Sequence, residues 1–165
     1  MNGIHIQDFI SKSETLARRI MIVNHWLRRI VLPFVFISHS GKDDKWVMRL
    51  EDDLLSEGIA TFTDHRHIRI GRRFSDIDRA LEDAKVMILV LSKSSVTNFN
   101  VRGEFTKWLN SKPDGTLLPL IIDECKLPFQ LGEILYLDSR RDEDYTSNMI
   151  TLVQAIKDIS QHAYP

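Results

Sequence analysis

The chain has few of the residues that mark several protein classes. It has one cysteine, Cys125, among 165 residues, which excludes an intrachain disulfide framework and a cluster of thiolate metal ligands. A reducing, cytoplasmic setting is therefore expected. Seven glycines and five prolines are too few for a collagen-like or low-complexity chain. The sequence predicts neither a signal peptide nor a membrane-spanning helix, because paired arginines interrupt the only long apolar stretch.

The chain also lacks an excess of charge of either sign. Its 22 Lys and Arg residues nearly balance its 23 Asp and Glu residues, so no general basic field favours nucleic-acid binding. The distribution is uneven, since residues 1–33 carry a net charge of +3 and the remainder −4. Apolar residues make up 43% of the chain, which is enough to build a globular core.

Residues 1–33 are predicted to form a helical extension. Ser11 and Glu14 form a capping box. Apolar residues then follow at alternating spacings of four and three: Leu16, Ile20, Val23, Leu27, Ile30 and Phe34. Pro33 ends the pattern. Such a helix either packs on its own domain or mediates self-association, because its apolar surface needs a cover.

From residue 34 to residue 165 the sequence predicts one α/β domain. Short apolar runs alternate with amphipathic segments, and several runs are apolar almost throughout, as in strands covered on both faces. The predicted strands are Phe34–Ser38, Thr61–Asp64, Val86–Ser92, Leu117–Ile122 and Ile134–Leu137. The predicted helices are Asp44–Glu57, Phe74–Ala84, Asn98–Asn110 and Ser147–His162. This order predicts a flavodoxin-like five-stranded parallel sheet flanked by helices.

In such a sheet, function is expected in the crevice at the carboxyl ends of the strands. The first loop there reads FISHSGKDD, from Phe36 to Asp44. Its hydroxyls, and the backbone N–H groups at a helix start, suit a phosphate, while Asp43 is a favourable N-cap residue. The same residues could instead simply cap the turn. The loop is not a Walker A loop, because GxxxxGK is absent.

Two further segments follow strands. Residues 64–73 contain four arginines and two histidines, typical of either a solvated loop or a site for a phosphorylated ligand. His65 and His67 lack a third ligand nearby, so no metal site is expected. In the helix after the third strand, Glu104 lies about 100° around the axis from the core residue Phe105. Asn100 stands one turn earlier on the face of Glu104.

The order and spacing of four pieces resemble a bacterial TIR (Toll/interleukin-1 receptor) domain. The pieces are FISHSGKD, TFTD, IRIGRRFSDIDRALEDAK and VMILVLSKSSV, the last followed by a glutamate about ten residues on. The resemblance covers roughly residues 34–159 and implies the same flavodoxin-like sheet. The family commonly has Trp at the position of Asn100, and many members have Pro at the position of Ile70.

The resemblance implies an NAD⁺ glycohydrolase that cleaves the nicotinamide–ribose bond to give nicotinamide and ADP-ribose or a cyclised ADP-ribose. NAD⁺ is then the substrate and no further cofactor is expected. Glu104 would be the catalytic residue. The residues predicted to bind the substrate are Phe36, Ser38, His39, Ser40, Asp43, Arg72, Phe74 and Asn100.

The resemblance also implies partners. The Asp64–Arg73 segment corresponds to the loop that covers the site in this family and mediates assembly with other TIR domains. A homo-oligomer active in bacterial defence or signalling is therefore expected, without a nucleic-acid or membrane partner. The alternative is a non-catalytic TIR–TIR interaction module. A receiver-like phosphoacceptor is disfavoured, because the first and third strands are followed by serines rather than by acidic residues.

Arg72 provides a test of these expectations. If its guanidinium clamps the diphosphate of NAD⁺, charge reversal in Arg72→Glu should raise the KM for NAD⁺. Steady-state kinetics of the purified variant measure the effect. An unchanged KM would remove Arg72 from the site.

Overall fold

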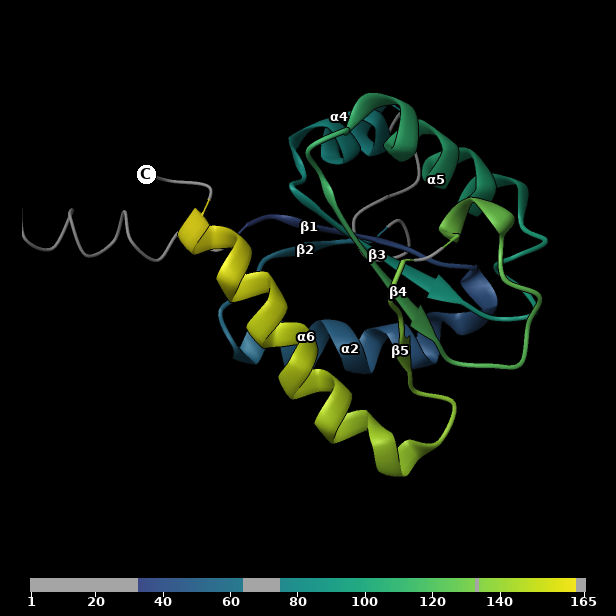
Figure 1. Ribbon diagram of the computed structural model, residues 1–165, viewed down its shortest axis with the longest axis vertical. Coiled ribbons are helices and arrows are strands. Elements are labelled where there is room, and N and C mark those ends of the chain that lie inside the picture. Colours follow the sequence, from purple (N-terminus) through teal and green to yellow (C-terminus); the bar gives the residue numbers. More distant parts are fainter. Residues whose placement is uncertain (1–32, 64–74, 133, 163–165) are drawn as a thin grey trace, which may run out of the picture. The chain divides into compact units, whose positions relative to one another are not determined.

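Five short parallel strands form the centre of the protein in the computed structural model, which describes residues 33–63, 75–132 and 134–162 (Figure 1). The strands are β1 (Val35–Ser38), β2 (Thr61–Phe62), β3 (Val86–Leu91), β4 (Thr116–Ile121) and β5 (Leu137–Asp138). Their spatial order is β2-β1-β3-β4-β5, and every neighbouring pair is parallel. The predicted flavodoxin-like sheet is confirmed. Because β2 lies on one side of β1 and β3 on the other, the winding reverses beside β1.

Helices cover the sheet on both faces, which explains the continuous apolar sequence of its central strands. Within the described ranges, these α-helices are α2 (Asp44–Ser56), α4 (Ser75–Asp83), α5 (Phe99–Ser111) and α6 (Asp142–His162). Helices α2 and α6 pack on one face, and α4 and α5 on the other (Figure 1). All six residues of β3 are buried. Ile88 and Val90 contact the α2 and α6 side, whereas Met87 and Leu89 contact the α4 and α5 side.

Most predicted boundaries agree with the structure to within about two residues, but the carboxyl-terminal third differs. The fifth strand was expected at Ile134–Leu137, whereas β5 is Leu137–Asp138. The edge strand pairs Leu137 with Leu120 and Asp138 with Ile121. Leu135 and Tyr136 precede this paired stretch and are exposed. Helix α6 begins at Asp142, five residues before the predicted start.

Two sequence predictions lie outside the described residues. These are the helical extension at residues 1–33, apart from Pro33 itself, and the arginine-rich segment at 64–73. The domain boundary near residue 33 therefore stays a prediction. In the part of the chain that the structure describes, no helix has the length and apolar character needed to cross a bilayer.

Gly103 within α5 and Gly115 after its end give a matched test of the packing. A Cβ at Gly115 would lie 2.7 Å from the ring of Trp108, which is 1% exposed. A Cβ at Gly103 would meet nothing within 4 Å. Gly115→Ala should therefore lower the free energy of unfolding by about 1–3 kcal/mol through overpacking. Gly103→Ala should raise it by about 0.5–1 kcal/mol through helix propensity. Urea denaturation measures both, and equal effects would contradict the packing of Trp108.

Candidate functional site

Glu104 projects from the second turn of α5 toward the carboxyl end of β1. The helix begins after Asn98, whose side-chain oxygen accepts hydrogen bonds from the backbone N–H groups of Asn100 and Val101 at 2.8 and 3.2 Å. This is the expected chemistry of an N-cap. Val101 and Phe105 are buried, which turns the flank with Glu104 partly toward solvent.

The carboxylate of Glu104 on α5 accepts a hydrogen bond from a residue of strand β1. Ser38, the last residue of β1, donates its hydroxyl to Oε2 of Glu104 at 2.5 Å. Ser38 is 1% exposed, so its hydroxyl is largely shielded from competing water. The contact joins residues 66 positions apart in the sequence. It lies where the winding of the sheet reverses, which is where ligands bind in open α/β sheets.

The first loop is more buried than the sequence indicated. Ser38, His39 and Ser40 are each no more than 6% exposed. Nε2 of His39 lies 3.0 Å from a carboxylate oxygen of Asp44, and Ser40 caps the short helix η1 (Gly41–Asp43). These three side chains make their hydrogen bonds within the fold. Gly41 and Lys42 are the exposed residues of the loop. The anion-binding role predicted for the hydroxyls stays a prediction.

Asp43 requires a correction. It occupies the N-cap position of α2, but its side chain makes no capping hydrogen bond. Its Oδ2 instead accepts the hydroxyl hydrogen of Ser92 at 2.6 Å. Ser92 directly follows β3, so a long-range partner competes with the local cap and wins. Ser92 belongs to the VMILVLSKSSV piece of the sequence, but nothing in that piece predicts its pairing with Asp43.

The other predicted substrate-binding residues are not gathered around Glu104 in the same way. Phe36 is 1% exposed and stacks on Phe62 in the core, with ring centroids 5.7 Å apart. It could therefore act only through the loop that it supports. Asn100 is exposed on α5. Arg72 and Phe74 lie outside the described residues.

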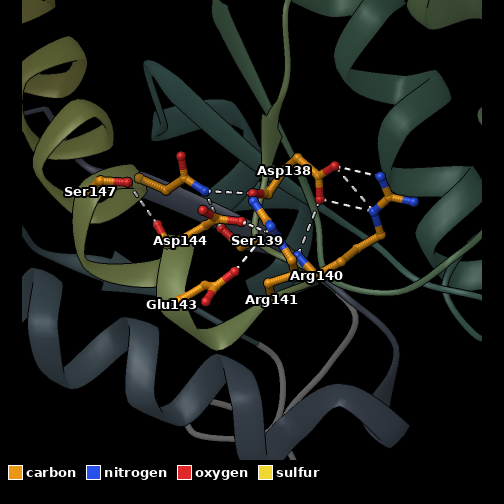
Figure 2. Close-up of polar contacts among 8 residues, drawn as sticks. Asp138, Ser139, Arg140, Arg141, Glu143, Asp144 and Ser147 are labelled. Atoms are coloured by element: carbon orange, nitrogen blue, oxygen red, sulfur yellow. Dashed lines mark hydrogen bonds and ion pairs between the residues drawn. The ribbon is translucent and has the colours of Figure 1, made fainter.

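An opening lies at the same edge of the sheet, beyond β4 and β5. It is a groove of about 820 Å³, lined among others by Glu124, Asp138, Arg140 and Arg141. Figure 2 shows its polar contacts. Both side-chain oxygens of Asp138 accept hydrogen bonds from Arg140 at 2.5–3.1 Å.

The charges in this groove are satisfied internally. The Arg140 guanidinium lowers the pKa of Asp138 to about 2, so the pair stays ionised at neutral pH. Arg141 contacts Glu143 and Asp144 (Figure 2). Four carboxylates line the groove against two guanidiniums, an arrangement that disfavours an anionic ligand. Sequence analysis did not single out this cluster, since no motif marks it.

The described residues give no support for a metal-binding site. Across the described ranges, no group of three or more His, Cys, Asp and Glu side chains is arranged to hold a metal ion. Cys125 is a free thiol, partly buried, and burial raises its pKa. A thiol with a raised pKa is a poor nucleophile at neutral pH.

Comparisons with solved structures point to one fold family. The chain is similar to the TIR domain of the Toll-related receptor TRR-2 from Hydra magnipapillata, with a TM-score of 0.66 and 25% sequence identity. The match covers 74% of this chain and 97% of that domain. The TIR domains of the activated Roq1 resistosome, which recognises the pathogen effector XopQ, match at 19% identity and a TM-score of 0.49. That match covers 78% of this chain and 83% of the other.

Comparison with curated proteins gave no match. The family model of the TIR domain matches residues 35–153. This range includes every strand of the sheet, the first loop and Glu104. The chain therefore belongs to the TIR domain family.

Proposed function

We propose that this TIR domain cleaves NAD⁺ at the bond between nicotinamide and ribose, with Glu104 as the catalytic residue. The observation that carries the proposal is the partly buried carboxylate of Glu104, held by Ser38 at the winding reversal of the sheet. The products are nicotinamide and ADP-ribose, linear or cyclised. NAD⁺ is the substrate, and the proposal requires no additional cofactor.

One carboxylate suffices for this reaction. Glycosidases that expel a poorly leaving oxygen use two carboxyl groups, one of them to protonate it. Nicotinamide leaves a cationic pyridinium as a neutral base, so it needs no general acid. The difficulty is the positive charge that develops on the ribose, and a carboxylate facing it stabilises that charge.

The size of the effect is sufficient for catalysis. At about 4 Å and an effective dielectric constant near 20, the attraction is roughly 4 kcal/mol before desolvation. Realised mainly in the transition state, it corresponds to a rate factor of about 10³. The hydrogen bond from Ser38 supports this role, because it orients one carboxylate oxygen.

The start of α2 favours the β1 and β3 side of the sheet for the diphosphate of NAD⁺. The groove beyond β4 and β5 has more carboxylates than guanidiniums, whereas the first loop exposes Gly41 and Lys42 at the start of α2. The N-terminus of a helix attracts phosphate. We assign the diphosphate to this first loop. Arg72 or Arg73 of the arginine-rich segment 64–73 would then act as a charge clamp.

Glu104→Gln tests the catalytic assignment. The amide keeps the shape of the side chain and can still accept the Ser38 hydrogen bond, but it loses the charge. Nicotinamide release should fall by about 10³-fold while the thermal midpoint stays near that of the unchanged protein. Chromatography of nicotinamide and ADP-ribose, with concentrated protein and NAD⁺, measures the loss.

The matched control is Glu124→Gln, which removes one charge at the groove beyond β4 and β5. This variant should turn over NAD⁺ at the original rate. Retained turnover in a folded Glu104→Gln protein would refute the assignment of Glu104.

A docking role is the second candidate. TIR domains associate with other TIR domains, and the Hydra domain that this chain resembles is part of a Toll-related receptor. In this alternative the 64–73 segment joins copies of the domain and no NAD⁺ is consumed. The two roles are compatible, since assembly could complete the site. We also propose a cytoplasmic role in bacterial defence or signalling, switched on by self-assembly.

Concentration dependence separates an assembly-activated enzyme from an independent one. If a neighbouring copy completes the site, the initial rate should rise faster than linearly with protein concentration. Rates measured across a hundredfold dilution series, with light scattering on the same samples, test this. A strictly proportional rate would show that one copy is sufficient.

A further inference from the structure

The turn after β3 contains a closed network of buried hydroxyls. Ser92 and Ser95 are 2% and 0% exposed. The hydroxyl oxygen of Ser92 accepts hydrogen bonds from the backbone N–H groups of Ser94 and Ser95 at 3.2 and 3.0 Å. In return, the hydroxyl of Ser95 accepts the N–H of Ser92 at 2.8 Å. A hydroxyl has two acceptor sites and one hydrogen to donate, so Ser92 has only its hydrogen left.

That hydrogen goes to Asp43. The distance from Oγ of Ser92 to Oδ2 of Asp43 is 2.6 Å, typical of a hydrogen bond to a charged acceptor. The direction is set, because both acceptor sites of the Ser92 oxygen are occupied. Residue 43 must therefore supply an acceptor, and it cannot be replaced by a donor.

Two side-chain hydrogen bonds thus connect the same pair of segments. Ser38 ends β1 and Asp43 lies in the segment that follows it, while Ser92 and Glu104 belong to the segment that follows β3. Ser38 contacts Glu104, and Asp43 contacts Ser92. The second bond holds the start of α2 against the turn that leads into α5, and so maintains the spacing that the first bond needs.

We infer that Asp43 is a positioning residue for Glu104, acting through Ser92, and not a residue that contacts the substrate. This inference rests on the proposed NAD⁺ cleavage. Loss of the bond allows the loop after β1 and the start of α5 to separate, so that Glu104 no longer faces the ribose in the required geometry. Displacement of a reacting group by about 1 Å costs on the order of 10²-fold in rate.

Three variants test the inference on the full chain. Asp43→Ala and Ser92→Ala should each lower kcat for NAD⁺ cleavage by about 10- to 100-fold, with KM changed by less than about twofold. Asp43→Asn should retain most of kcat, because its amide oxygen still accepts the Ser92 hydrogen. The double variant Asp43→Ala with Ser92→Ala should be no slower than either single one, since both remove the same bond.

The matched control is Thr97→Ala in the same turn. Its hydroxyl donates to the carbonyl oxygens of Lys93 and Ser94 within the same turn, so kcat should stay unchanged. A readout independent of turnover is the ¹³C NMR signal of the Glu104 carboxyl carbon. It should move in Asp43→Ala and Ser92→Ala and stay in place in Thr97→Ala.

The outcomes are distinguishable. A raised KM with unchanged kcat in Asp43→Ala would mean that Asp43 touches the substrate, which overturns the inference. Unchanged kcat and an unmoved Glu104 signal in the single variants would overturn it as well. If the unchanged protein does not cleave NAD⁺, the proposed function fails, while the Glu104 signal still decides whether Asp43 and Ser92 position that carboxylate. If the alanine variants do not fold, a Glu104 signal in Asp43→Asn that matches the unchanged protein supports the inference, and a moved signal contradicts it.

Discussion

The parallel pairing of β1 with β3 is the constraint on which the arrangement of this protein depends. Both strands are buried on both faces, so the chain must cross between them by helices and all carboxyl ends meet at one edge. Ser38 ends β1 and Ser92 directly follows β3. Both serines therefore lie at this edge, beside the loops that leave the two strands. The hydrogen bonds to Glu104 and Asp43 are consequences of that pairing.

Two polar regions at this edge differ in their electrostatics. Beside β1 and β3, one carboxylate is oriented by a buried hydroxyl and lies near an exposed helix start. Beyond β4 and β5, each arginine is held by carboxylates of its own neighbourhood, as for Arg140 and Asp138. Exposed ion pairs contribute little net free energy, so the excess of carboxylates, and not the pairing, is what disfavours an anion there.

Prediction from the sequence succeeded where burial and pattern agree. The six apolar residues of β3 are buried throughout, and the stripe of α5 with Val101 and Phe105 packs as expected. It failed for β5, because Leu135 is apolar yet 91% exposed. The start of α6 was missed because its first turn is acidic rather than apolar, although acidic residues themselves favour a helix start.

Local composition by itself determined the order of strands and helices, the parallel sheet and the position of Glu104 on the flank of α5. These features depend on hydrophobic period and chain direction, which short segments encode. Only the tertiary structure decided which partner each polar side chain takes. Ser38 reaches Glu104 across 66 positions, and Asp43 gives up a local cap for Ser92 across 49. Such pairings depend on the distance between loops after the sheet has formed, and no spacing along the chain records that distance.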